Sequence, residues 1–376
     1  MDKSRYLKPV IREFLKKKMV FLGGPRQVGK TTLCLSFLKP PDTHNPAYLN
    51  WDSVTIKPLL RQGMLPTNPL VVIDEIHKYK LWRGLIKGFY DQNKGHQNYL
   101  ITGSARLDLY RRGGDSLLGR YRYLRLHPFS AGELGIKNRQ DLDGLLKFGG
   151  FPEPFLAQSE QDHRLWIRER LYRIVNDDIA SLENLNEYSR LELLADSLNS
   201  RVASLLSLKS LEEDLQVSQK TIAHWVEILE HIYYVFRIYP FGSPKIRALK
   251  KTAKVYLWDW SEVNDSGARF ENMVASHLLK YCHFLEDTQG YKMELRYIRD
   301  TDHREVDFVV VKNRKPIFAV ECKTGDKQLS KSILYFKERM SIPQFYQVHL
   351  GTADYRSKEG IRVLPFLNFC NELELP

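Results

Sequence analysis

The fold of this chain is decided by Gly24-Pro25-Arg26-Gln27-Val28-Gly29-Lys30-Thr31, which fits the phosphate-binding pattern G-x-x-x-x-G-K-[ST]. An apolar run at 19–22 precedes this loop, and a Leu/Cys/Leu pattern follows it. This order predicts a strand, a loop and a helix, which is the structural context that the pattern needs. Glycines allow backbone N–H groups to close around phosphate oxygens. A Gly-rich turn without a ligand is the alternative interpretation.

Two side chains of the loop carry the chemistry that phosphate binding needs. We expect Lys30 to reach the β- and γ-phosphates of a nucleotide and the Thr31 hydroxyl to ligate Mg²⁺. The predicted cofactors are therefore ATP and Mg²⁺. The residues expected to contact the nucleotide are Gly24, Pro25, Arg26, Gln27, Val28, Gly29, Lys30, Thr31 and Thr32.

An acidic pair follows a second apolar run. The run at 70–73 predicts a buried parallel strand, and Asp74 and Glu75 follow at its carboxyl end, where open α/β sheets bind ligands. We expect Asp74 to hold Mg²⁺, directly or through water, and Glu75 to polarise the water that attacks the γ-phosphate. A third predicted strand at 99–102 leads to Ser104, which we expect to contact the γ-phosphate. An ordinary turn serine is the alternative for Ser104.

Length and composition indicate a globular protein of two or three domains. The chain has 376 residues, of which 43% are hydrophobic and 27% are charged. Its net charge of +12 and its pI of about 9.3 favour an acidic partner, with nucleic acid as the leading candidate. Positive charge that serves only solubility is the alternative, because the excess is dispersed along the chain.

Cysteine usage and hydropathy predict a cytoplasmic protein. Cys34, Cys282, Cys322 and Cys370 are far apart, without the spacing of a zinc site or a redox motif, so we expect reduced thiols. The N-terminus carries no apolar signal core, and no apolar stretch approaches the length that spans a bilayer. We therefore expect no membrane partner.

Residues 207–239 have the pattern of a helix-turn-helix. Apolar residues recur at helical spacing on both sides of a turn at 216–217. Ser218 is the predicted N-cap of the second helix, and the segment 233–239 is predicted to form a wing strand. The face expected to be exposed carries Gln219, Lys220, Ala223, His224 and Glu227, which is weakly basic for a DNA reader, so packing or subunit contact is equally compatible. A better candidate for phosphate contact is the basic tract, formed by Lys245, Arg247, Lys250, Lys251 and Lys254, and a solvated loop is the alternative.

A second chemical constellation lies near the C-terminus. Two predicted strands, 304–311 and 316–323, flank a short polar turn and form a hairpin. Glu321 and Lys323 share one face by period-2 alternation, and Asp307 on the neighbouring strand can reach the same point. Two carboxylates and a lysine suit Mg²⁺-assisted phosphodiester hydrolysis, and Glu271 on the preceding helix could complete the metal shell. A buried salt-bridge cluster is the alternative.

Several segments together carry a family resemblance. They are Gly-Gly-Pro-Arg-Gln-Val-Gly-Lys-Thr-Thr (23–32), Val-Ile-Asp-Glu-Ile-His-Lys (72–78), Leu-Ile-Thr-Gly-Ser-Ala-Arg (100–106), Leu-Gly-Arg-Tyr (118–121) and Leu-His-Pro-Phe-Ser (126–130). The chain thereby resembles a group of bacterial and archaeal AAA-type ATPases whose C-terminal domain has long been described as of unknown function. In that group a winged helix and a domain similar to restriction-endonuclease-like nucleases follow the ATPase core.

The resemblance implies roles for individual residues. It carries the ATP-site roles to Lys30, Thr31, Asp74 and Glu75, and supports a nuclease-like site of Asp307, Glu321 and Lys323, joined by Glu271. Arg120 matches the Gly-Arg position of the group and is our candidate for an arginine finger that acts on a neighbouring subunit. Its competitors are Arg106, Arg111 and Arg112.

These observations predict an α/β protein that begins with a P-loop AAA-type ATPase core at 1–135. A helical lid at 136–206, a winged helix-turn-helix at 207–245 and a restriction-endonuclease-like α/β domain at 246–376 are expected to follow. The first functional hypothesis is a homo-oligomeric ring that hydrolyses ATP to translocate or remodel DNA and carries a nuclease-like metal site. The second is an ATP-gated switch or protein remodeller whose nuclease-like domain is an interaction module.

Overall fold

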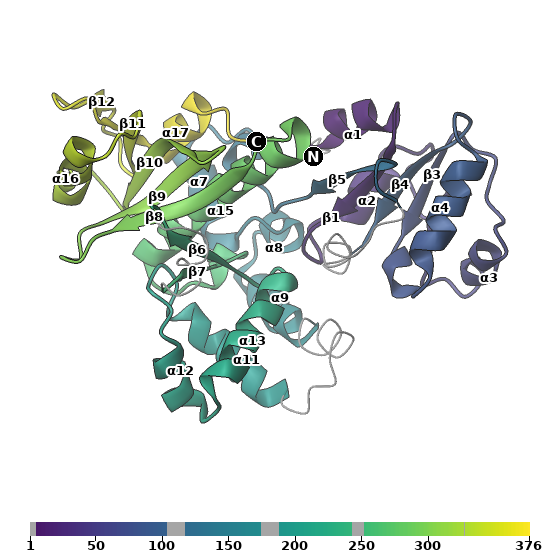
Figure 1. Cartoon of the computed structure of the whole chain (residues 1–376), viewed down its shortest axis with the longest axis horizontal. Coiled ribbons are helices and arrows are strands. Elements are labelled where there is room, and N and C mark those ends of the chain that lie inside the picture. Colours follow the sequence, from purple (N-terminus) through teal and green to yellow (C-terminus); the bar gives the residue numbers. More distant parts are fainter. Residues whose placement is uncertain (1–4, 104–116, 174–187, 243–251, 327) are drawn as a thin grey trace. The chain divides into compact units, whose positions relative to one another are not determined.

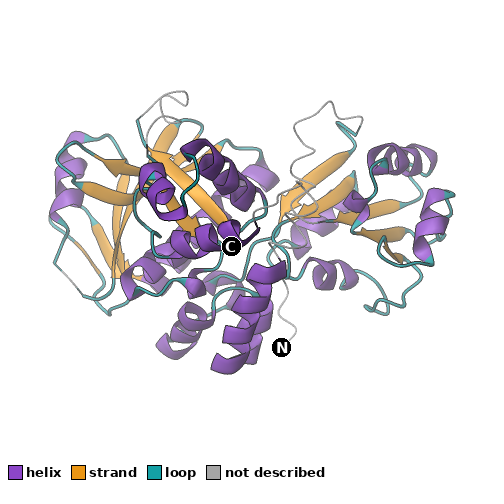
Figure 2. Ribbon diagram, turned by 90° about the horizontal axis from the view of Figure 1, so that it is seen from below, coloured by secondary structure: helices purple, strands orange, loops and turns teal. Residues whose placement is uncertain are grey.

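The computed structural model describes residues 5–103, 117–173, 188–242, 252–326 and 328–376. The chain divides into two compact units, Met1–Pro128 (unit 1) and Phe129–Pro376 (unit 2). Each unit contains a sheet with helices packed beside it (Figures 1 and 2). Within the described residues, no helix combines the length and the apolar character that crossing a membrane requires.

Unit 1 is built on a parallel sheet. Its elements are α1 (Lys8–Leu15), β1 (Met19–Gly23), α2 (Lys30–Leu35), β2 (Tyr48–Asn50), α3 (Ile56–Arg61), β3 (Leu70–Asp74), the 3₁₀ helix η1 (Ile76–Lys78), α4 (Trp82–Gln92), β4 (Asn98–Thr102) and β5 (Tyr121–Arg125). The five strands lie in the order β2-β3-β4-β1-β5, and every neighbouring pair is parallel. The strands expected at 19–22, 70–73 and 99–102 are thus confirmed as β1, β3 and β4.

The apolar runs of unit 1 form strands because they are buried on both faces. All five residues of β1 are buried, as are Val71, Val72 and Ile73 of β3. On one face, Phe21 and Ile73 pack in a cluster with Trp82 and Phe89 of α4 and with residues near α3. This packing fixes the strand order and thereby brings the carboxyl ends of β1, β3 and β4 to one edge.

Unit 2 begins with helices and ends with a large sheet. Its elements are α6 (Ala131–Leu134), α7 (Arg139–Phe148), α8 (Pro152–Ala157), α9 (Glu160–Arg173), α11 (Tyr188–Asn199), α12 (Leu208–Leu215), α13 (Gln219–His231), β6 (Val235–Pro240), β7 (Lys254–Leu257), η4 (Trp260–Glu262), α15 (Ser266–Gln289), β8 (Met293–Arg299), β9 (Glu305–Lys312), β10 (Lys315–Lys323), α16 (Lys331–Arg339), β11 (Gln344–His349), β12 (Tyr355–Arg356), β13 (Arg362–Pro365) and α17 (Phe366–Glu372). Eight strands form the sheet, in the order β12-β13-β11-β10-β9-β8-β6-β7.

The predicted helix-turn-helix corresponds to α12 and α13. Ser218 is the N-cap of α13, as expected, because its side chain accepts a hydrogen bond from the backbone N–H of Thr221. The strand expected as a wing is β6, which pairs antiparallel with β7 and parallel with β8. The wing strand is therefore not separate from the C-terminal part of the chain, because it belongs to the eight-stranded sheet.

The predicted hairpin is formed by β9 and β10. Asn313 and Arg314 connect them with φ angles of 49° and 68°, the left-handed values that two-residue hairpin turns require. Alternate residues of β10 face opposite layers, since Phe318 contacts Tyr281 of α15 whereas Ala319 packs with Ile333 of α16. The helix expected at 268–281 is longer than predicted, because Asp265 caps α15 and Gly290 ends it at φ 75°.

Candidate ATP site and acidic cluster

The phosphate-binding loop connects β1 to α2 and depends on glycine at two positions. Gly24 has φ 131°, and a Cβ there would lie 2.4 Å from the backbone oxygen of Leu126. Gly29 has φ 90° directly before α2. Both values lie in the region that side chains rarely adopt, so the two glycines of the pattern are needed for the loop's shape.

Lys30 lies in the first turn of α2 and is turned into the loop. Its Nζ donates hydrogen bonds to the backbone oxygens of Gly24 at 3.0 Å and Pro25 at 2.6 Å, and the side chain is buried. The ammonium is therefore held where the loop would enclose phosphates, and its contact with the β- and γ-phosphates stays a prediction.

Asp74 accepts hydrogen bonds from three hydroxyl groups. Thr31 Oγ1 donates to Oδ2 at 2.8 Å, Tyr48 OH donates to the same oxygen at 2.8 Å, and Thr102 Oγ1 donates to Oδ1. These contacts follow from the strand order, because β2 and β4 flank β3 and end at the same edge. Burial and the adjacent Asp74 carboxylate raise the pKa of Tyr48, so the phenol stays a donor.

Glu75 directly follows β3 in a left-handed backbone conformation with φ 57°. Its carboxylate lies 3.4 Å from Lys78 Nζ, so η1 supplies a counter-charge for it. A residue other than glycine with this φ is uncommon, and such values concentrate at functional sites. The structure thus brings Lys30, Thr31 and Asp74 together in one network and places Glu75 next to Asp74 in the chain.

Three contributors to this site were not predicted from the sequence. Tyr48 and Thr102 donate hydrogen bonds to Asp74. Arg5 supports the loop: its Nη1 donates to the backbone oxygen of Val28 at 2.6 Å, and its Nη2 donates to the backbone oxygen of His127 at 2.5 Å. Thr102 ends a strand that was predicted, so its place beside the site could have been inferred. Neither Tyr48 nor Arg5 belongs to a recognisable motif.

The remaining ATP-site predictions concern Ser104 and the arginines. Ser104, Arg106, Arg111 and Arg112 lie outside the described residues. Arg120 precedes β5 at the amino-terminal edge of the sheet, because its backbone oxygen accepts from Met19 N–H at the start of β1. Its guanidinium donates to Asp91 of α4 at 2.8 and 3.2 Å. Arg120 is thus on the edge opposite the phosphate-binding loop of its own unit.

The residues present fit a Mg²⁺–nucleotide complex. Magnesium prefers hard oxygen ligands, and the Thr31 hydroxyl and the Asp74 carboxylate lie in direct contact at the end of the loop. The Lys30 ammonium adds the positive charge that polyphosphates need.

In unit 2 the predicted nuclease-like residues form part of what we call the acidic cluster, made up of Glu271, Glu305, Asp307 and Glu321. Lys323 Nζ donates to Glu321 Oε1 at 2.7 Å. Burial, with the Asp307 charge added, raises the pKa of Glu321 to about 7. The pairing of Glu321 with Lys323 on one face of β10 confirms the expected alternation.

The expectation that Lys254 belongs to a phosphate-binding tract is wrong, because the side chain is buried. Lys254 is only 2% exposed, and its Nζ lies 3.2 Å from Glu271 Oε1 and 3.8 Å from Asp307 Oδ1, with Glu305 Oε1 also in contact. Burial lowers the pKa of Lys254, but the three carboxylates outweigh this effect and raise it. A charged Lys254 therefore lies inside the acidic cluster.

Two further cluster oxygens are engaged, whereas Glu321 Oε2 is buried and has no hydrogen-bond partner among the described residues. Tyr256 OH donates to Glu271 Oε1 at 2.7 Å, and the backbone N–H of Cys322 donates to Asp307 Oδ2 at 2.8 Å. Across the part of the chain that the structure describes, no group of three or more His, Cys, Asp or Glu side chains has an arrangement that could hold a metal ion. The metal role of Glu271, Asp307 and Glu321 stays a prediction, and the position of Lys254 argues against it.

Three family models match segments of the chain. Residues 16–135 match an AAA domain, whereas 139–264 and 266–369 match two domains of unknown function, DUF8612 and DUF4143. The AAA-domain match includes the phosphate-binding loop and Asp74, so it supports a P-loop ATPase core in unit 1. The helical lid, winged helix and nuclease-like domain that the resemblance implied stay predictions.

Relatives with curated sequences are distant. An uncharacterized protein of Mycobacterium tuberculosis is 26% identical over 247 residues, which are 64% of this chain and 54% of that protein. The match thus spans about half the length of the mycobacterial relative. An uncharacterized protein of Methanocaldococcus jannaschii is 21% identical over 385 residues, covering 92% of this chain and 84% of that protein.

Solved structures with local similarity include two proteins. The ORC1 protein of Aeropyrum pernix, solved in complex with DNA, has a TM-score of 0.35 and 14% identity, covering 72% of this chain and 92% of that one. A RuvB variant of Thermotoga maritima has a TM-score of 0.29 and 16% identity, covering 61% and 88%. Both TM-scores are too low to indicate a shared overall fold.

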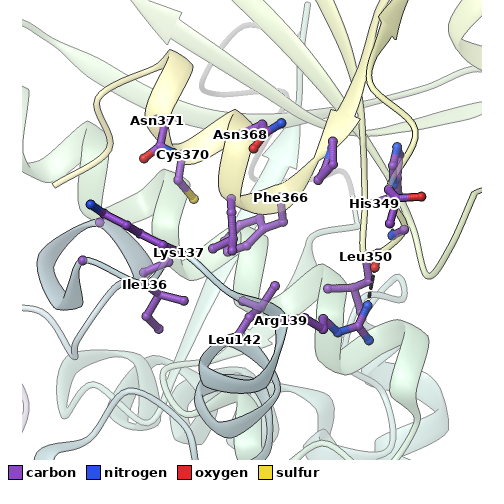
Figure 3. Close-up of a pocket in the computed structure, with 17 residues that line it drawn as sticks. Ile136, Lys137, Arg139, Leu142, His349, Leu350, Phe366, Asn368, Cys370 and Asn371 are labelled. Atoms are coloured by element: carbon purple, nitrogen blue, oxygen red, sulfur yellow. Dashed lines mark hydrogen bonds between the residues drawn. The ribbon is translucent and has the colours of Figure 1, made fainter.

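Unit 2 also contains a cavity of about 580 Å³ (Figure 3). Ile136, Leu142 and Phe366 contribute apolar lining, and Lys137 and Arg139 border it with cationic groups. Arg139 donates to the backbone oxygen of Leu350 across the cavity wall. The cavity shares no lining residue with the acidic cluster.

Proposed function

We propose that unit 1 hydrolyses ATP with Mg²⁺ as the metal. The observation that carries this proposal is the hydrogen bond between Thr31 and Asp74, which joins the last residue of the phosphate-binding pattern to the acidic end of β3. A loop that only made a tight turn would not need a buried carboxylate facing its hydroxyl. The match of this segment to an AAA domain supports the same conclusion.

Each residue has a defined task in this proposal. Lys30 exchanges the two loop carbonyls for phosphate oxygens, and Thr31 and Asp74 would hold the metal, which neutralises charge that develops on the phosphates. Glu75 accepts a hydrogen bond from the attacking water and orients it toward the γ-phosphate. Ser104 is proposed to contact that phosphate. Tyr48 and Thr102 keep the Asp74 carboxylate in one orientation.

Two substitutions test the ATPase assignment. Lys30→Ala should abolish turnover and weaken nucleotide binding, whereas Glu75→Gln should retain ATP without hydrolysing it, because only the water-orienting group is lost. Turnover is measured as phosphate release and binding by a fluorescent ATP analogue, with exposed Lys39→Ala as the control. Wild-type turnover in Lys30→Ala would refute the assignment of this loop, and wild-type turnover in Glu75→Gln would refute the role of Glu75.

We further propose that the chain assembles into a homo-oligomeric ring that acts on DNA. The net charge of +12 supports a polyanionic partner. Of the face expected to contact DNA, Gln219, Lys220, His224 and Glu227 of α13 are exposed and Ala223 is half-buried. Arg120, which lies away from the loop of its own unit, suits a role on a neighbouring subunit's ATP.

A switch or protein remodeller is the second candidate, and a specific observation favours it. The acidic cluster is filled by Lys254, so unit 2 is better suited to binding than to cutting. The two functions differ in one measurement, which is the effect of DNA on ATP hydrolysis. Stimulation by duplex or single-stranded DNA supports the DNA motor, whereas turnover that DNA leaves unchanged supports the protein remodeller.

A further inference from the structure

Lys254 is a buried lysine whose position is set by the sheet. It begins β7, lies opposite Ile238 of β6, and also bridges to Leu205. These backbone contacts fix its Cα, and the side chain is only 2% exposed, so the ammonium is held away from solvent. Its closest charged neighbours all belong to the acidic cluster.

The charges of this region come close to balance without any added ion. Lys254 is in contact with Glu271, Glu305 and Asp307, and Lys323 pairs with Glu321. Arg299 adds a third cation, because its Nη1 lies 2.9 Å from the second oxygen of Glu305. Four carboxylates thus face three basic side chains, which leaves one net negative charge when all are ionised. Burial disfavours this uncompensated charge.

These and neighbouring contacts use oxygens of Glu271 and Asp307 that a divalent metal would need, although Glu321 Oε2 is buried without a hydrogen-bond partner among the described residues. Glu271 Oε1 accepts from both Lys254 and Tyr256, and Asp307 Oδ2 accepts from a backbone N–H. A metal placed among these carboxylates would also lie within a few ångströms of the Lys254 ammonium. Like charges at such a distance in a buried site repel each other strongly.

We propose that the Lys254 ammonium is the resident cation of the acidic cluster, in the place where the nuclease-like hypothesis puts a divalent metal. The cluster then serves to fix α15 against β7 and β9, and unit 2 binds its partner without cleaving it. This inference is independent of ATP hydrolysis in unit 1, because none of its residues belongs to the ATP site.

Manganese binding by the full-length chain tests this proposal directly. All proteins carry Asp74→Asn, which removes the metal ligand of unit 1, and no nucleotide is added. With Lys254 intact, electron paramagnetic resonance should show no Mn²⁺ bound with a dissociation constant below the millimolar range. Mn²⁺ binding that is tighter than this and is lost on Asp307→Asn overturns the proposal.

Removal of the ammonium should create the metal site. Lys254→Met leaves the four carboxylates without their central cation, so Mn²⁺ should bind and raise the Tm of unit 2. We expect a rise on the order of 3–6 °C at a Mn²⁺ concentration tenfold above the dissociation constant. The matched control is Lys280→Met, which removes another buried lysine, 1% exposed and paired with Glu133 in the same unit, and should gain no Mn²⁺ dependence.

A second variant covers the case in which Lys254→Met does not fold. Lys254→Met with Glu305→Gln removes one charge of each sign and keeps the carboxylates of Glu271, Asp307 and Glu321. A folded variant of either kind that takes up Mn²⁺ supports the proposal. A folded variant that binds no Mn²⁺, or one that binds no more than Lys280→Met, overturns it.

Discussion

The phenol of Tyr48 donates a hydrogen bond to the Asp74 oxygen that also accepts from Thr31. Asp74 Oδ2 therefore has two hydroxyl donors, one on the P-loop helix and one on the neighbouring strand. Only the first of these belongs to a motif. The second is positioned by the parallel pairing of β2 with β3, in which Tyr48 lies opposite Val72.

Tyr48→Phe should raise the Mg²⁺ concentration that unit 1 needs for ATP hydrolysis. Loss of this donor leaves the Asp74 carboxylate less well oriented, and outer contacts of this type are worth about 10-fold or more in metal affinity or activity. The measurement is phosphate release as a function of Mg²⁺ concentration at fixed ATP, with Tyr79→Phe as the control. An unchanged Mg²⁺ dependence would mean that Tyr48 contributes packing only and does not orient the Asp74 carboxylate.

Arg120→Ala should lower turnover while ATP affinity stays nearly constant, because a finger acts mainly in the transition state. Arginine fingers are worth about 10³-fold or more. Asp91→Ala is the matched variant, because it removes a carboxylate that pairs with Arg120 and leaves the arginine side chain in place. Mixing Arg120→Ala with Lys30→Ala protein should restore some activity. Turnover that is independent of protein concentration, from a chain that stays monomeric with ATP, would contradict a shared site.

DNA affinity should fall steeply with salt, because the proposed contacts join lysine or arginine to phosphate. Lys245, Arg247, Lys250 and Lys251 lie outside the described residues and stay candidates. Neutralising all four should reduce the slope of log K against log salt by up to about 3.6. Fluorescence anisotropy with a labelled duplex provides the measurement. No binding at low salt, with or without ATP, would exclude the DNA hypothesis.

Acid should destabilise unit 2 through His277. The ring is buried, Nδ1–H donates to the Met273 backbone oxygen at 2.7 Å, and Nε2 accepts from Ala131 N–H at 3.0 Å. Burial lowers the pKa of His277 to about 3, whereas an unfolded histidine titrates near about 6.5. Between these values the unfolded chain binds the extra proton. The contribution of neutral His277 to the free energy of unfolding is therefore complete above pH 6.5. It is lost as the pH falls toward 3, by at most about 1.4 kcal/mol per pH unit.

Urea unfolding of wild-type and His277→Gln protein at pH 7 and pH 5 tests this expectation. Glutamine can donate and accept in place of the imidazole but does not titrate, so the variant should lose less stability between the two pH values. Exposed His96→Gln is the control and should behave as the wild type. Equal losses in all three proteins would show that His277 does not contribute to acid sensitivity.

Local patterns predicted the elements well because each depends on nearby residues. The P-loop, the acidic end of β3, the β9–β10 hairpin and the Ser218 cap all follow from composition and period within a few positions. Strand order does not follow in this way. Tyr48 and Thr102 contact Asp74 only because β2 and β4 flank β3, and periodicity in one sequence does not specify neighbours.

The prediction for Lys254 was wrong because the burial of this residue depends on partners that are distant in the sequence. Five basic residues between 245 and 254 have the composition of a solvated tract, and their sequence alone does not mark the last one as buried. Its carboxylate partners come from α15 and β9, which are 17 to 53 residues away (254 to 271 and 254 to 307). Only the folded sheet brings the opposite charges to one point.

The pairing of β6 with both β7 and β8 has a consequence for dissecting this protein. A fragment that begins at residue 246, the boundary predicted from the sequence, would lack β6 and would leave the β7 and β8 edges unpaired. Unpaired strand edges promote aggregation. The complementary fragment would carry β6 with its backbone donors unsatisfied. Expression of the two parts separately should therefore yield insoluble protein, whereas a cut between residues 128 and 129 spares every strand pair of the described sheets.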